Sequence, residues 1–299
     1  MRPALLIRNP LSGGRDWAPR LDRILANLAA AGFHSTVRAT EAAGHATELA
    51  RASAEGRDYD VVFGLGGDGT LREIAVGLLG SPIPLGLLPG GTTNVLALSL
   101  GIPTNAVAAS RVYNARDLRV IDHDIGMCGD KPFIMMVSAG IDALLLERAS
   151  QQAKKRWGKL AVGAQALAAA RDYSFPTFSL SSQGHHQEGS FAMVANIPLY
   201  GGEFTVTPRA RPDDGVLDLA VLTATGIVPT LTFALDLAIG AHDKRQDVEI
   251  WRSRLARLDL TGEPSEALIQ IDGDPVRLPL PQDISLSPDR VKLLLPTPR

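Results

Sequence analysis

The chain has 299 residues, of which 45% are hydrophobic and 21% are charged, and its formal net charge is −2. This length suggests about two domains with sizeable cores, and the near-neutral charge argues against a general attraction to nucleic acid or acidic lipid. The single cysteine excludes an intrachain disulfide, which fits a reducing cytoplasm. The N-terminal apolar run is too short for a signal peptide and no uncharged stretch is long enough to span a membrane, so we expect a cytoplasmic protein.

Up to about residue 120, short apolar runs alternate with helical patterns. The predicted strands are 4–7, 33–37, 61–65 and 84–88, and the predicted helices are 17–31, 45–53, 70–79 and 93–100. Strands that are apolar on both faces and alternate with helices predict a parallel sheet covered on both sides. Ligands of such sheets bind beyond the carboxyl ends of the strands.

The pattern changes near residue 122, where short alternating runs separated by turn signals begin. The runs 133–137, 191–195, 217–222, 255–260 and 268–271 predict an antiparallel β domain, interrupted by one helical insert from 143 to about 170. We therefore predict an α/β domain at 1–122 and a β-rich domain at 123–289. The C-terminal segment 290–299 is a candidate to return to the first domain.

Three of the predicted strands end in loops of small residues. These loops are Asn9-Pro10-Leu11-Ser12-Gly13-Gly14, Gly66-Gly67-Asp68-Gly69-Thr70 and Pro89-Gly90-Gly91-Thr92-Thr93-Asn94. The carboxyl ends of parallel strands meet at one edge of a sheet, so all three loops are expected there. Glycines let backbone N–H groups approach phosphate oxygens, and the helix N-termini that follow favour negative charge. The sequence therefore predicts a phosphate site.

Two further features refine this site. Thr70 and Glu73 form a capping-box pattern, which predicts a helix start at Thr70. Asp68 lies where a carboxylate could hold Mg²⁺ or orient a group beside the phosphates. The same stretch also fits a dinucleotide fingerprint, but no Asp or Glu lies between Glu73 and Asp117 to bind a ribose hydroxyl, so a hydride-transfer enzyme is disfavoured.

Taken together, the three loops resemble the catalytic-domain motifs of the diacylglycerol kinase and sphingosine kinase superfamily, in particular its soluble bacterial lipid kinases. The Gly-Gly-Asp-Gly-Thr loop alone is shared with NAD kinases, and a close variant occurs in phosphofructokinases. The resemblance implies an N-terminal three-layer parallel-sheet domain, a C-terminal antiparallel β-sandwich domain and ATP bound between them. The residues it assigns to the nucleotide are Asn9, Ser12, Gly13, Thr40, Gly66, Gly67, Asp68, Gly69, Thr70, Leu71, Arg72, Gly91, Thr92 and Asn94.

In the second half, the resemblance assigns a structural Mg²⁺ to the Asp214 carboxylate and to the backbone carbonyls of Arg211 and Val216. Ile271-Asp272-Gly273-Asp274 is similar to the Asp-Gly-Glu motif of the family, with Asp274 in place of the proposed general base. Both segments are also ordinary hairpin signals, so a purely structural role stays open for each. Val95 stands where many relatives have an Asp.

These assignments predict an ATP- and Mg²⁺-dependent kinase of a lipid alcohol of the diacylglycerol or sphingoid type, with Asp68 and Asp274 as catalytic residues. Its partners would be ATP and a lipid at a membrane surface, met by transient peripheral contact, and not nucleic acid; a homodimer stays open. The basic segment 154–160 could rest on lipid headgroups, although a solvated helix face explains it slightly better. The alternatives are a kinase of a soluble alcohol or NAD, and an inactive nucleotide- or lipid-binding regulator.

Overall fold

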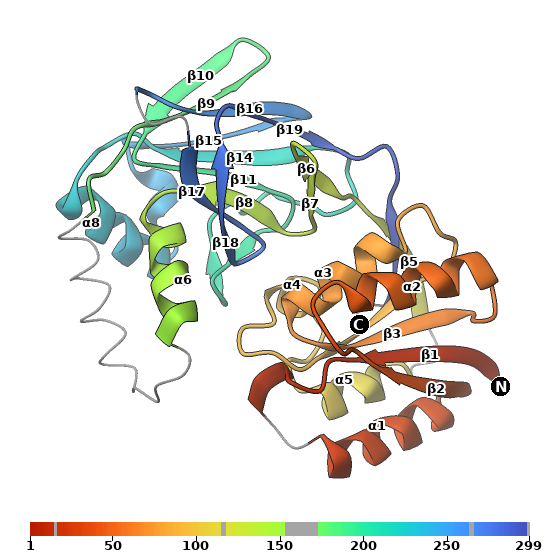
Figure 1. Cartoon of the computed structure of the whole chain (residues 1–299). Helices are drawn as coiled ribbons and strands as arrows, with labels where there is room; N and C mark the ends of the chain where they lie inside the picture. The colour runs from red at the N-terminus through yellow and green to blue at the C-terminus, as the bar shows by residue number, and fades with distance from the viewer. Residues whose placement is uncertain (15–16, 115–117, 153–172, 263–265, 298–299) are drawn as a thin grey trace.

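The computed structural model describes residues 1–14, 17–114, 118–152, 173–262 and 266–297. A six-stranded sheet organises the N-terminal half, in the order β2-β1-β3-β4-β20-β5 (Figure 1). Its strands are β1 Arg2–Arg8, β2 Phe33–Ala39, β3 Val61–Gly66, β4 Leu85–Pro89, β5 Leu118–His123 and β20 Val291–Pro296. All neighbouring pairs are parallel except β20 and β5, which are antiparallel.

Helices cover both faces of this sheet. They are α1 Ala18–Ala30, α2 His45–Gly56, α3 Asp68–Gly77, α4 Val95–Ser99 and α5 Ala106–Val112, preceded by the 3₁₀ turn η1 Ser12–Gly14. Helices α1 and α5 pack together on one face, and α2 and α3 on the other (Figure 1). Every residue of β3 and β4 is buried between these layers, as the continuous apolar runs require. The predicted three-layer parallel-sheet domain is confirmed.

Two antiparallel sheets make up the C-terminal half. One has the order β10-β9-β16-β19-β6-β7, and the other has the order β15-β14-β11-β8-β17-β18. The strands are β6 Gly126–Cys128, β7 Lys131–Phe133, β8 Met136–Ala139, β9 Phe178–Ser182, β10 His185–Gly189, β11 Phe191–Ala195, β12 Leu199–Tyr200, β13 Phe204–Thr205, β14 Leu217–Leu222, β15 Val248–Ser253, β16 Leu255–Leu260, β17 Glu266–Ile271, β18 Asp274–Pro279 and β19 Gln282–Leu286. Side chains of both sheets form one buried cluster, which confirms the predicted β-sandwich.

The helical content of this half corrects the sequence analysis. Helix α6 Ile141–Gln152 confirms the first part of the predicted insert, and residues 153–170 lie outside the described residues. A second helix, α8 Ile227–Ala238, follows β14, and the 3₁₀ turn η2 His242–Lys244 follows it. The prediction of a single helical insert is therefore wrong. Helix α8 begins with β-branched residues of modest helix propensity and has few polar positions to mark a period.

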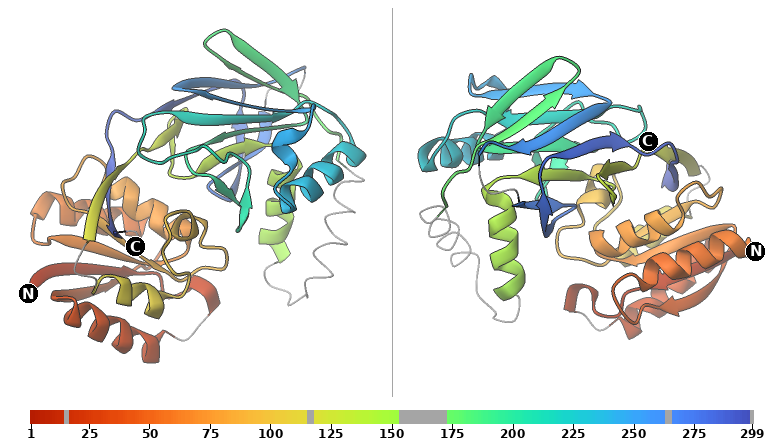
Figure 2. Two further views of the ribbon diagram at one scale, coloured as in Figure 1. Left: turned by 180° about the vertical axis from the view of Figure 1, so that it is seen from behind. Right: turned by 45° about the horizontal axis from the view of Figure 1, so that its top comes forward.

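The two halves are linked through both β5 and β20, since the last strand of the chain inserts between β4 and β5. Views from behind and from above place α6 and α8 at one end of the β-sandwich (Figure 2). No helix in the described part of the chain is long and apolar enough to cross a membrane. The domain division at residue 122 stays a prediction.

Tyr113 substitutes for a missing strand partner at β4. Strand β20 pairs with β4 only at Leu85 and Gly86. At the next residue, the buried Tyr113 hydroxyl accepts from the Leu87 N–H (2.6 Å) and donates to the Leu87 carbonyl (3.1 Å). Tyr113 thus satisfies backbone groups that the sheet leaves unpaired in the core.

We expect Tyr113→Phe to lower the free energy of unfolding by about 1–3 kcal/mol, because it leaves the buried Leu87 N–H and carbonyl without hydrogen-bond partners. Urea denaturation of the variant measures this loss. The control is Tyr59→Phe, at a half-buried tyrosine in the loop before β3. An equal and small effect of both substitutions would contradict the assignment.

Candidate functional site

The three glycine loops lie together at the carboxyl edge of the first sheet, as predicted from the parallel strands. Strand pairing extends into them: Asn9 N–H donates to the Leu65 carbonyl (2.9 Å), and Gly90 N–H donates to the Gly66 carbonyl (2.7 Å). Strands β1, β3 and β4 therefore deliver their loops side by side.

The loops after β3 and β4 touch through glycine backbones. A Cβ added at Gly91 would lie 2.7 Å from the Gly67 Cα, so neither loop has room for a side chain there. Gly69 differs, because a Cβ added to it would meet nothing within 4 Å. Packing therefore does not explain the glycine at position 69. An open space beside the first turn of a helix is what a phosphate group needs.

Helix α3 starts earlier than predicted. It begins at Asp68 with Gly67 as its N-cap, so the capping box proposed for Thr70 and Glu73 is wrong. The Thr70 hydroxyl instead accepts from the Asn9 side-chain amide (3.1 Å), and the Glu73 carboxylate accepts from Ala46 N–H (3.3 Å). These two side chains bind the loop after β1 and the first turn of α2. Helix α3 has no side-chain cap, which leaves its first turn available to a ligand.

Asp68 binds the N-terminus of α4. Its Oδ2 accepts from Val95 N–H (2.9 Å) and from the Thr93 hydroxyl (3.3 Å), and its Oδ1 accepts from Leu96 N–H (3.2 Å). Burial raises the pKa of this carboxyl group, and the hydrogen bonds from Val95, Leu96 and Thr93 oppose that rise. Asp68 thus joins the loops that follow β3 and β4. Its predicted role toward Mg²⁺ stays a prediction.

A cavity of about 550 Å³ lies on one side of the β3 loop. Its lining includes six of the residues assigned to the nucleotide: Asn9, Ser12, Thr40, Gly67, Gly69 and Thr70. The Ser12 hydroxyl accepts from Gly67 N–H (3.3 Å), which closes one wall. The structure thus brings together assigned residues from the segments that follow β1, β2 and β3.

Three assigned residues have roles inside the fold, and a fourth, Gly13, lies at the surface. Leu71 is fully buried in the core. Gly66 is buried, and a Cβ on it would lie 2.6 Å from the Thr70 Cβ. The Asn94 side chain accepts from Gly91 N–H (2.8 Å) and donates to the Gly91 carbonyl (3.1 Å), so it shapes the loop from behind. Gly13 is exposed and has a positive φ of 68° in η1.

The Asp272-Gly273 pair forms the turn of the β17–β18 hairpin, as the hairpin signal predicts. Ile271 pairs with Asp274 across it, and both turn residues have positive φ, 51° for Asp272 and 87° for Gly273. The buried Asp272 carboxylate accepts from the backbone N–H groups of residues 134, 135 and 136, at 2.8, 2.8 and 3.0 Å. Burial raises the pKa of Asp272 to about 6, although these hydrogen bonds and the charge of Arg72 oppose the rise.

Arg72 connects the two domains at this hairpin. Its Nη2 lies 2.6 Å from Asp274 Oδ2, and its Nη1 donates to the Ile271 carbonyl (3.0 Å). The guanidinium leaves α3 of the first domain and binds the end of β17 and the start of β18 in the second. Arg72, assigned to the nucleotide from sequence, therefore also positions Asp274.

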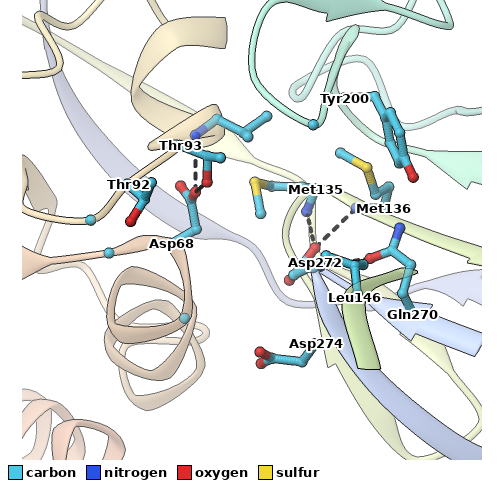
Figure 3. Close-up of a pocket in the computed structure, with 16 residues that line it drawn as sticks. Asp68, Thr92, Thr93, Met135, Met136, Leu146, Tyr200, Gln270, Asp272 and Asp274 are labelled. Atoms are coloured by element: carbon cyan, nitrogen blue, oxygen red, sulfur yellow. Dashed lines mark hydrogen bonds between the residues drawn. The ribbon is translucent and has the colours of Figure 1, made fainter. Parts of the chain in front are cut away.

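A second cavity, of about 300 Å³, lies between the domains (Figure 3). Its first wall comes from the glycine loops and includes Asp68, Thr92 and Thr93. The facing wall comes from the β-sandwich half and combines Asp272 and Asp274 with apolar side chains. The apolar lining residues of this half are Met135, Met136, Leu146 and Tyr200, and Val95 adds to them from α4. The glycine loops, which are of the type that binds phosphate, thus line the same cavity as two carboxyl groups.

Behind this wall lies a buried polar network that sequence reasoning missed. Asp142 Oδ2 accepts from the Ser138 hydroxyl and from the Tyr200 hydroxyl (2.8 Å), and burial raises the Asp142 pKa. Gln270 donates to Ser138 (2.8 Å) and accepts from Gly273 N–H (2.6 Å). Through the bond between Gln270 and Gly273 N–H, the network stabilises the Asp272-Gly273 turn. Its members come from four separate segments, so no local motif signals them.

The segment assigned to a structural Mg²⁺ is satisfied by protein donors. Asp214 Oδ2 accepts from Arg252, and its Oδ1 accepts from Val216 N–H (3.2 Å). Beside it, Asp124 accepts from Gly215 N–H (2.7 Å) and pairs with Arg290 (2.7 Å). A cation on Asp214 would have to displace the Arg252 guanidinium, so this arrangement fits a metal poorly. The metal role of Arg211, Asp214 and Val216 stays a prediction.

Comparison with known proteins identifies the family. Residues 3–124 match the diacylglycerol kinase catalytic domain, and residues 135–295, more than half of the chain, match the YegS C-terminal NAD kinase β-sandwich-like domain. The chain therefore belongs to the family of diacylglycerol kinase and YegS-like lipid kinases. The resemblance inferred from the loop motifs is confirmed.

Individual relatives agree with this family. A protein named "Probable lipid kinase YegS-like" from Pseudomonas putida is 31% identical over 249 residues, which cover 81% of this chain and 82% of that protein. The diacylglycerol kinase of Bacillus subtilis is 27% identical over 282 residues, covering 92% of this chain and 90% of the relative. A crystal structure of a diacylglycerol kinase from Bacillus anthracis superimposes with a TM-score of 0.71 at 21% identity, over 98% of this chain and 97% of the other, which supports the fold.

The raised pKa of Asp272 predicts a dependence of stability on pH. Since its pKa in the folded protein lies near 6, its stabilising contribution is complete below the unfolded pKa of about 4 and is lost as the pH rises through 6. We expect the free energy of unfolding of the wild type to fall relative to that of Asp272→Asn by on the order of 3 kcal/mol between pH 4 and 7. Urea denaturation across this range measures the difference. A constant difference would contradict the raised pKa.

Proposed function

We propose that this protein transfers the γ-phosphate of ATP to the hydroxyl group of a lipid alcohol of the diacylglycerol or sphingoid type. The observation that carries the proposal is the interdomain cavity, in which glycine loops face two carboxyl groups and an apolar wall. Phosphoryl transfer depends mainly on holding the donor and acceptor in line and on neutralising charge. The glycine loops of the first domain would hold the phosphate donor, and the facing wall of the second domain would hold the acceptor.

The donor side is proposed to hold ATP. The larger cavity beside Asn9 and Thr40 accommodates the nucleoside, and the β3 loop separates it from the interdomain cavity. Gly67 and Gly69 line both cavities, so phosphates can pass over them toward the acceptor. Backbone N–H groups in the first turn of α3 would bind the phosphate oxygens.

Mg²⁺ bound with ATP would neutralise charge on the transferred phosphoryl group. Asp68 fits this ion, because its carboxylate lines the interdomain cavity while three protein donors use only part of its hydrogen-bonding capacity. The hydrogen bonds to α4 fix the direction of the carboxylate.

Asp274 is the proposed general base on the acceptor side. Its side chain lines the cavity and is 57% exposed, so a substrate hydroxyl can reach it. Arg72 holds one carboxylate oxygen at 2.6 Å and leaves the other for the substrate. The side chain is shorter than Glu by one methylene, and the bond to Arg72 compensates by fixing its position relative to α3.

Apolar side chains favour a lipid over NAD or a sugar. Met135, Met136 and Leu146 lie beside the carboxyl groups and offer apolar contacts to the acyl chain of a lipid whose hydroxyl reaches Asp274. The names of the relatives, lipid kinase and diacylglycerol kinase, support the same substrate class.

The test is transfer of radiolabelled phosphate from ATP to a panel of lipid alcohols in detergent micelles, with NAD and soluble alcohols alongside. We expect Asp274→Asn to lower kcat by about 10²- to 10⁴-fold, as loss of a general base does, and Asp274→Glu to retain most activity. Asp283→Asn, an exposed carboxylate on β19 outside the cavity, is the matched control.

Three outcomes would overturn parts of the proposal. Transfer to NAD or a soluble alcohol alone would exclude the lipid as substrate. ATP binding without transfer to any acceptor would indicate a regulator. Full activity of Asp274→Asn would remove Asp274 as the base while leaving the substrate class intact.

A further inference from the structure

Helix α8 presents an apolar face to solvent. Four large side chains at helical spacing are strongly exposed: Val228 (71%), Leu231 (42%), Leu235 (67%) and Ile239 (77%). Thr232, Ala234 and Ala238 between them are exposed as well, so the outward face carries no charge. Exposed apolar patches of this kind mark interaction sites in soluble proteins.

The helix is held firmly with this face outward. Phe233 and Leu237 are buried against the β-sandwich, and the Phe233 ring lies 5.7 Å from that of Phe191. The one charged residue of α8, Asp236, is bound by Arg245 (2.7 Å), which also pairs with Asp247. The ion pair with Arg245 therefore neutralises the Asp236 charge away from the apolar face of the helix.

The apolar face is connected to the interdomain cavity through the β12–β13 hairpin. Strand β13 packs against α8, and its Phe204 is 42% exposed. Strand β12 packs against α4, and Tyr200 and Gly201 of this hairpin line the cavity. The hairpin therefore joins the apolar face of α8 to the cavity that Asp274 lines.

The size of the face argues against a second protein as its occupant. A stable protein interface uses about 20–30 residues on each partner, whereas the exposed face of α8 offers seven side chains, from Val228 to Ile239. A short helix whose outward face is uncharged and carries Leu, Ile and Val suits insertion into the boundary between headgroups and acyl chains.

We propose that α8 and the neighbouring Phe204 dock the protein on a phospholipid bilayer by apolar insertion; this inference rests on the proposed lipid substrate. The docking orients the interdomain cavity toward the membrane through the β12–β13 hairpin. Because no basic side chain takes part, the contact does not require anionic lipid.

The test is flotation of the full-length protein with phosphatidylcholine vesicles at high salt, without ATP and without a lipid alcohol. We expect the wild type to float, and the double variant Leu235→Gln/Ile239→Gln to lose about tenfold or more in partition coefficient, because it withdraws two apolar side chains from the bilayer. The control is Leu255→Gln, a 55% exposed leucine on β16. Activity toward lipid in detergent micelles should be the same in all three proteins.

Unchanged flotation of the double variant would overturn the proposal, as would failure of the wild type to float. Binding that appears only with anionic vesicles would overturn it in favour of the basic segment 154–160. A wild-type dimer that the double variant dissociates, measured by sedimentation equilibrium, would identify the face as a subunit interface instead. Flotation uses no substrate, so its outcome is independent of whether the kinase assay succeeds.

Discussion

The bond between Arg72 and the β17–β18 hairpin is the constraint on which the candidate site depends. Two charge-assisted hydrogen bonds from one guanidinium fix both a side chain and a backbone carbonyl of the other domain. Arg72 is one turn into the helix whose start faces the glycine loops. Any shift of the hairpin relative to the phosphate loops must therefore break these bonds.

Three other aspartates bind backbone N–H groups. Asp68 holds the start of α4, Asp272 holds the segment from 134 to 136, and Asp124 holds Gly215. Each bond joins segments that are distant in sequence, so loops without regular structure acquire fixed positions. The cost is desolvation, which raises the pKa values of all three carboxyl groups. Asp274, whose side chain is 57% exposed, is more accessible to a substrate than these three carboxyl groups.

Local patterns predicted the elements well and their connections less well. The apolar runs at β1, β3 and β4 could be recognised because a buried parallel strand has no polar positions, and the loops after them followed from the parallel order. The meeting of the three glycine loops at one edge of the sheet could thus be predicted from the sequence. The role of Asp272 did not, since three hydrogen bonds to residues more than a hundred positions away leave no trace in spacing. Helix α8 was missed because its outward face is as apolar as its inward one.

The insertion of β20 between β4 and β5 has a consequence for how the protein is made. The first sheet contains a strand that emerges from the ribosome after the whole β-sandwich, and β5 has β20 as its sheet neighbour. The strands that carry the phosphate loops are translated early, whereas this edge of β4 stays unpaired until β20 has been synthesised. Such long-range pairing slows folding and leaves an exposed strand edge in the nascent chain.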